Sequence, residues 1–157
     1  CVNSFAKAKS NGEFMRARLQ DIEDFFEENH DLNNDDENLV RIRKVLKEMD
    51  KAFKKKGSMI SSRAVAVTAY LFVEDLFVRK ETTLIPVFAK FFFTLLKEIN
   101  HNMELLSKYE QPANSVVMEE FQKYILQASV EGYSIKRRHD FFKKAFDHFN
   151  QYLEYLQ

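Results

Sequence analysis

Turn-forming residues are scarce in this chain, and their scarcity limits the folds it can adopt. Only 3 glycines and 2 prolines occur among 157 residues, so few positions favour a tight turn. Along the chain, apolar residues recur at spacings of three and four, which is the periodicity of amphipathic helices. The sequence therefore predicts an all-α fold, a single compact bundle of about six helices.

The apolar spacing and the turn residues together give approximate helix positions. Helices are expected near residues 15–26, 34–56, 62–79, 86–99, 117–128 and 134–156. Asn34 is expected to cap the second helix and Gly57 to end it, while Ser134 is expected to cap the last. The buried side of the second helix is predicted to comprise Leu39, Ile42, Leu46, Met49 and Phe53.

The segment at residues 62–79 is apolar almost all round, so we expect it to be the central helix of the bundle. Its run "AVAVTAYLFV" is about half the length that crosses a bilayer, and charged residues close it at both ends. A buried core helix fits this run better than a membrane span, and we expect no membrane partner.

The chain has no net charge, because 24 Lys and Arg balance 24 Asp and Glu. A molecule without a net field is not steered towards nucleic acid as a whole. The charges are nevertheless uneven: residues 20–37 carry nine acids, and residues 41–56 carry eight basic residues. These blocks either complement the dipole of the second helix or form a surface for a partner, and the sequence leaves both readings open.

A single cysteine, Cys1, cannot form an internal disulfide, and this length can bury a core without one. These features favour a cytoplasmic protein. Because the chain begins with Cys1 rather than methionine, we expect the 157 residues to form one helical domain of a longer protein.

No motif for catalysis or cofactor binding stands out. The glycines form no phosphate-binding loop and no serine lies in a glycine-flanked turn, so we expect no catalytic residue, cofactor or metal in this chain. One remote alternative is a di-iron bundle, because two Glu-x-x-His pairs occur, Glu27 with His30 and Glu98 with His101.

Calcium binding is a weaker alternative in the acidic block. Asp31, Asn33 and Asp35 imitate the first ligands of a calcium-binding helix-loop-helix. Asp36 and Ile42, however, stand where that loop needs glycine and a bidentate carboxylate, so calcium is not expected.

The basic cluster in "SIKRRHDFF" is expected in the first turn of the last helix, where cations oppose the helix dipole. Such a placement suggests a specific role. Arg138 and His139 are interpreted as an internal or interdomain clamp, with Arg138 holding a carboxylate. The alternative is a nucleic-acid contact through the exposed cations Lys136, Arg137, Lys143 and Lys144.

Three stretches resemble the helical region of GmrSD-type proteins, a bacterial family with a ParB/sulfiredoxin-like domain that includes restriction and anti-phage systems. The resemblance spans about residues 20–148 and rests on the helix pattern and on the segments "SRAVAVTAYLF" and "SIKRRHDFF". It implies that Arg63, Arg138 and His139 occupy recurring polar positions that make architectural or interdomain contacts.

The family's chemistry resides in a nucleotide-dependent domain with an Asp-Gly-Gln-Gln-Arg motif and in a His-rich nuclease domain, and neither motif occurs in these 157 residues. The resemblance therefore implies a non-catalytic domain that supports or couples a neighbouring catalytic domain and contacts DNA at most in a subsidiary way. The alternative is a free-standing helical module that binds a protein partner through its first two helices.

Overall fold

The computed structural model describes residues 14, 16, 18–60, 62–107 and 131–155, and the regular structure within these ranges is all helical. This confirms the all-α prediction. The α-helices are α2 (Leu19–Glu28), α3 (Glu37–Phe53), α4 (Arg63–Val78), α5 (Ile85–Ser107) and α7 (Gly132–Tyr155). Short 3₁₀ helices at Lys54–Met59 and Thr82–Leu84 follow α3 and precede α5. The helix expected near residues 117–128 lies outside the described residues.

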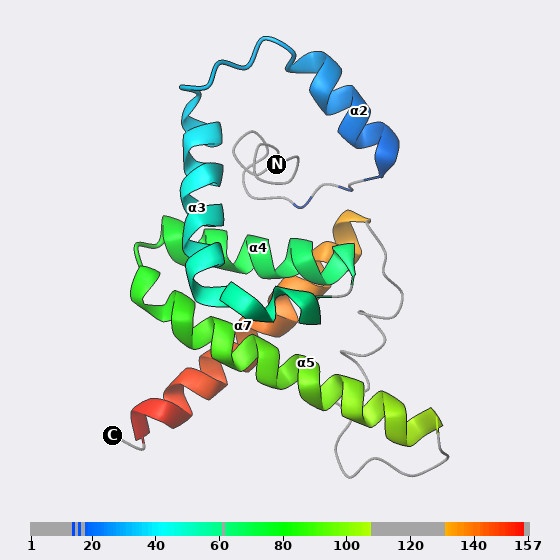
Figure 1. Cartoon of the computed structure of the whole chain (residues 1–157), viewed down its shortest axis with the longest axis vertical. Helices are drawn as coiled ribbons and strands as arrows, with labels where there is room; N and C mark the ends of the chain where they lie inside the picture. The colour runs from blue at the N-terminus through cyan, green and yellow to red at the C-terminus, as the bar shows by residue number, and fades with distance from the viewer. Residues whose placement is uncertain (1–13, 15, 17, 61, 108–130, 156–157) are drawn as a thin grey trace.

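Helices α3, α5 and α7 pack around α4, so the predicted central helix is confirmed (Figure 1). Ser62 caps the start of α4, where its hydroxyl accepts a hydrogen bond from the Val65 amide at 3.2 Å. Buried residues occur on most sides of this helix, as its apolar sequence predicts. α2 stands apart from the bundle in the same view, joined to α3 by residues 29–36.

Helix α4 ends in a Schellman motif that turns the chain towards α5. Lys80 adopts the left-handed conformation, with φ at 61°. Its amide donates to the Phe77 carbonyl at 3.1 Å, and the Glu81 amide donates to the Leu76 carbonyl at 2.9 Å. A lysine therefore occupies a backbone position that usually favours glycine.

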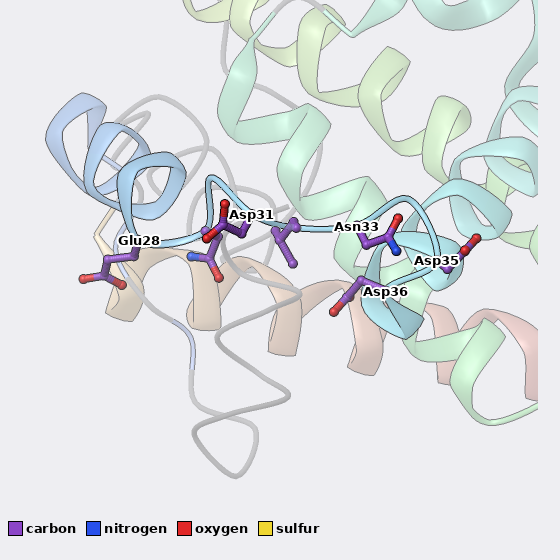
Figure 2. Close-up of a pocket in the computed structure, with 7 residues that line it drawn as sticks. Glu28, Asp31, Asn33, Asp35 and Asp36 are labelled. Carbon is purple, nitrogen blue, oxygen red and sulfur yellow. The ribbon is translucent and has the colours of Figure 1, made fainter.

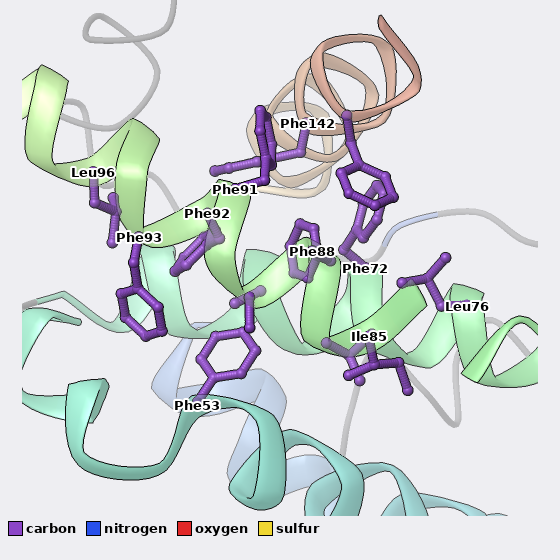
Figure 3. Packing of buried hydrophobic residues seen from close by; sticks show 14 of the residues in the cluster. Phe53, Phe72, Leu76, Ile85, Phe88, Phe91, Phe92, Phe93, Leu96 and Phe142 are labelled. Carbon is purple, nitrogen blue, oxygen red and sulfur yellow. The ribbon is translucent and has the colours of Figure 1, made fainter. Parts of the chain in front are cut away.

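The core is a cluster of phenylalanines to which all four bundle helices contribute (Figure 3). Phe72 of α4 stacks on Phe88 of α5 with ring centroids 4.3 Å apart. Phe53 of α3 meets Phe93 edge-on at 5.1 Å, and Phe146 of α7 meets Phe88 at 90°. Each fully buried phenylalanine contributes roughly 1.5–3 kcal/mol through the removal of apolar area from water. This cluster fixes α7 against α4 and α5.

The ends of α3 differ from the prediction. Its cap is Asp36, whose carboxylate accepts from the amides of Asn38 at 2.8 Å and Leu39 at 3.2 Å. Asn34 instead accepts hydrogen bonds from the Arg43 guanidinium through its side chain and its carbonyl. α3 also ends at Phe53, before Gly57, because Lys54 leaves the helical conformation with φ at 36°.

The buried side of α3 was also predicted only in part. Ile42 and Phe53 are buried as expected, but Leu46 is 49% exposed and Val45 is fully buried. α4 and α5 both pack on α3, and the side they cover is centred on Val45. Leu46 therefore lies at the edge of the contact.

Helix α7 begins one residue after Glu131, earlier than predicted. The Ile135 amide already donates to the Glu131 carbonyl at 3.0 Å, so Gly132 is the first helical residue and Ser134 does not cap the helix. Lys136 consequently lies beyond the first turn. The expected conflict between these cations and the helix dipole is therefore wrong, because that effect is confined to the first turn.

None of the helices in the described residues combines the length and the apolar character that crossing a bilayer requires.

Candidate functional site

A buried polar cluster lies along α4, where this helix packs against α7 and α3. Among the described residues, the buried polar side chains are Thr68 and Glu74 on α4 and Arg138 and His139 on α7. Buried polar groups need partners, because an unpaired group in a low-polarity interior costs free energy. The partners of these four side chains define what the cluster can do.

Arg138 is 1% exposed and is the largest fully buried side chain in the described part of the chain. Its Nε donates to the Thr68 hydroxyl at 3.1 Å. The same hydroxyl donates to the Ala64 carbonyl at 2.8 Å, which leaves its oxygen lone pairs available to accept from Arg138. Burial lowers the pKa of the Arg138 guanidinium, because the interior disfavours its charge.

His139 lies beside Arg138 and contacts the end of α4. Its Nε2 is 2.6 Å from an oxygen of Asp75, and its ring is 6% exposed. This nitrogen is buried and makes no well-aligned hydrogen bond, so the contact with Asp75 is described by its short distance alone. The rings of Phe14 and Phe72 lie 5.1 Å and 5.8 Å from the imidazole.

A His–Asp pair can serve in acid–base catalysis when a substrate reaches the imidazole. Here aromatic rings flank the imidazole, and Asp140 lies 3.9 Å from its other nitrogen. The two described pockets lie elsewhere, one in the loop after α2 and the other between α3 and α5. The arrangement joins two helices and offers no described path for a substrate.

Glu74 extends the polar cluster towards α3. Its carboxylate is 4% exposed and lies 3.4 Å from Nε of Arg41 and 3.5 Å from the Tyr70 hydroxyl. Arg41 is itself partly buried. This ion pair links α3 to α4 in the same way that Arg138 and His139 link α7 to α4.

The expected site residues separate into a buried set and an exposed set. Arg138 and His139 lie in the polar cluster, whereas Arg63 is exposed at the first position of α4 and is not part of it. Arg138 was expected to hold a carboxylate, and the hydrogen bond that positions its Nε runs to the hydroxyl of Thr68.

The four cations expected to contact nucleic acid are exposed on α7. Lys136 pairs with Asp140 at 3.1 Å, one turn further on. Arg137 donates to the Tyr133 hydroxyl at 2.8 Å and lies over that ring at 5.1 Å. Lys143 and Lys144 continue the exposed face by two further turns, with the acid Asp140 between the two groups of cations.

The residues of the metal alternatives are exposed and lie apart in the fold. His30 follows α2, and Glu98 and His101 are on the outer side of α5. Within the described ranges, no group of three His, Cys, Asp or Glu side chains is placed to hold a metal ion.

The acidic loop after α2 lines a shallow pocket, and Figure 2 shows its labelled side chains projecting in different directions. Asp36 is already used as the cap of α3. The loop therefore does not gather its oxygens around one point.

Thr68, Glu74, Asp75 and Arg41 are site residues that the sequence analysis did not identify. A signal for two of them is present, because Thr68 interrupts an apolar run and Glu74 closes it. A polar residue inside a helix buried on most sides must find a partner on a neighbouring helix. Which neighbour supplies that partner follows only from the packing.

Comparisons of the chain with protein-family models, with curated proteins and with solved structures gave no match.

Proposed function

We propose that this chain is a non-catalytic helical domain of a GmrSD-like restriction or anti-phage protein, in which it supports or couples a neighbouring nucleotide-dependent nuclease domain. One observation carries the proposal. The segments "SRAVAVTAYLF" and "SIKRRHDFF", on which the resemblance rests, form the start of α4 and the start of α7 and pack against each other. Their polar residues meet in the hydrogen bond between Arg138 and Thr68.

The chemistry of this cluster favours a supporting role. Arg138, His139 and Glu74 all have partners on a neighbouring helix and lie in the interior. Side chains used in this way fix the positions of helices. We therefore assign nucleotide binding and DNA cleavage to another domain of the same protein.

DNA contact is a subsidiary part of the proposal. The exposed face of α7 carries Lys143 and Lys144 next to the cations of the preceding turns. Such a patch suits phosphate groups, which position a protein on DNA without reading its sequence. A restriction system acts on DNA inside the bacterial cell, so the proposal includes a cytoplasmic location.

The coding sequence around this chain tests the proposal. We expect a ParB-like domain with an Asp-Gly-Gln-Gln-Arg motif to be encoded upstream in the same reading frame. Phage plating with the whole protein then tests the role of the domain: Arg138→Ala should reduce protection, and Lys90→Ala, a change at an exposed cation of α5, should not. A reading frame that starts at this domain, with no such motif in it, would refute the proposal.

The alternative, a free-standing interaction module, is favoured by a different observation. Leu19 and Phe26 on α2 are 67% and 62% exposed, which is unusual for large apolar side chains. If α2 and α3 bind a protein partner through these exposed side chains, the module functions without a neighbouring catalytic domain.

A further inference from the structure

Helix α2 is an amphipathic arm whose apolar side is partly open to solvent. None of its residues is buried. Leu19 and Phe26 are seven residues apart and therefore share one side of the helix, and both are more than 60% exposed. Glu23 and Glu27, on the neighbouring side, are also exposed. Apolar anchors at this spacing are how an amphipathic helix enters a groove on a partner.

The outer face of α3 has the complementary character. Arg43, Lys44, Lys47 and Lys51 are exposed along it. Leu46 lies at the edge of this basic face and is 49% exposed. An exposed leucine next to a mostly basic face matches an arm of exposed apolar residues bordered by acids.

The arm is held away from α3 of its own chain. At its start, the Arg18 guanidinium pairs with Glu131 beside α7, and Phe14 packs on His139. At its other end, Arg43 holds Asn34 close to the first turns of α3. α2 consequently stands off from α3 in Figure 1. The complementary faces cannot close on each other within one chain while both ends remain fixed.

We propose that two copies of this chain associate, with the α2 arm of each lying on the outer face of α3 of the other. The contact is reciprocal, because each copy supplies one arm and one basic face, and a two-fold axis closes it. Leu19 and Phe26 supply apolar area against Leu46, and the flanking charges set the orientation. This inference goes beyond the proposed function. It does not depend on whether the chain is a domain of a GmrSD-like protein or a free-standing module.

Light scattering coupled to gel filtration tests the association with the whole 157-residue chain. At low salt and high protein concentration, the mass is expected to rise from 18.6 kDa towards twice that value. It should fall again as NaCl is raised from about 0.05 M to about 0.5 M, because salt screens exposed charges. Phe26→Asp is expected to abolish the rise, and Val78→Asp, a change at an equally exposed apolar residue of α4, should leave it intact.

Charge reversal separates a second copy from any other partner. Glu23→Lys/Glu27→Lys and Lys44→Glu/Lys47→Glu should each remain monomeric alone, because like charges then meet at both contacts. Mixed in equal amounts, the two variants present opposite charges at both contacts and should form a heterodimer.

Three results would overturn the proposal: a monomeric parent chain under all these conditions, a dimer that survives Phe26→Asp, or a mixture that stays monomeric. Circular dichroism of each variant confirms that these exposed substitutions leave the helices folded.

Discussion

Arg138 Nε donates a hydrogen bond to the hydroxyl of Thr68 at 3.1 Å, joining two helices across 70 residues of sequence. The guanidinium is buried and its pKa is lowered by burial, so the interior disfavours its charge. A costly group is tolerated in an interior when it is well paired. The interface between α4 and α7 therefore depends on this pair, and its removal should be measurable.

Thr68→Val removes the acceptor while keeping the size and branching of the side chain. The free energy of unfolding is expected to fall by about 1–3 kcal/mol, because the buried Nε–H of Arg138 loses its partner. Thr68→Ser keeps the hydroxyl and should cost clearly less. Urea unfolding of both variants provides the comparison, and equal midpoints for Thr68→Val and the parent would argue against the hydrogen bond.

Arg41→Ala removes a cation that faces the buried carboxylate of Glu74. The free energy of unfolding is expected to fall by about 1–3 kcal/mol, because the buried carboxylate loses one of its partners. The double variant Arg41→Met/Glu74→Leu should regain most of the lost stability, since no charge then remains buried. A double variant that is less stable than Arg41→Ala alone would show that the ion pair contributes more than its burial costs.

Lys80→Gly tests the end of α4. Lys80 has φ at 61°, a conformation that costs an ordinary residue about 1–3 kcal/mol and glycine almost nothing. Glycine also makes the unfolded chain more flexible, which offsets part of this benefit. We therefore expect the free energy of unfolding to rise by about 0.5–1 kcal/mol. Lys80→Ala, which keeps the unfavourable conformation, should show no gain in thermal unfolding.

The DNA contact is tested by Lys143→Ala/Lys144→Ala. Both lysines are exposed, so the melting temperature should not change. If they contact phosphates, affinity for duplex DNA should fall and its salt dependence should decrease by about one unit for each lost contact. An unchanged salt dependence would remove these residues from the DNA-binding proposal.

Lys136→Ala is expected to have little effect on stability, since its exposed pairing with Asp140 contributes about 0.3–0.5 kcal/mol at most.

The sequence predicted those parts of the fold that depend on local pattern. Residues 62–79 were expected as the central helix, and α4 at Arg63–Val78 confirms this because its apolar character and its serine cap act locally. The register of α3 was harder to predict, since both Val45 and Leu46 are apolar and only the positions of α4 and α5 decide which one is buried. The early start of α7 was missed because Ser134 was expected to cap the helix, whereas its hydrogen bonds already begin at the Glu131 carbonyl.

Only the residues that α7 contributes to the candidate site were predicted. Arg138 and His139 stand out as a charged group before a pair of phenylalanines. Their partners Thr68 and Asp75 lie on a helix far away in the sequence, and no spacing rule connects the two segments. Only the packing of α7 against α4 brings them together.

The most direct test of this account is the unfolding free energy of Arg138→Ala, with Arg137→Ala as the matched neighbour. Arg138→Ala is expected to lower it by more than about 1.5 kcal/mol, because the hydrogen bond to Thr68 is lost and a cavity opens at the interface between α4 and α7. Arg137 is exposed, so its variant should unfold within about 0.5 kcal/mol of the parent. Superimposable unfolding curves for Arg138→Ala and the parent would contradict the claim that this buried arginine holds the domain together.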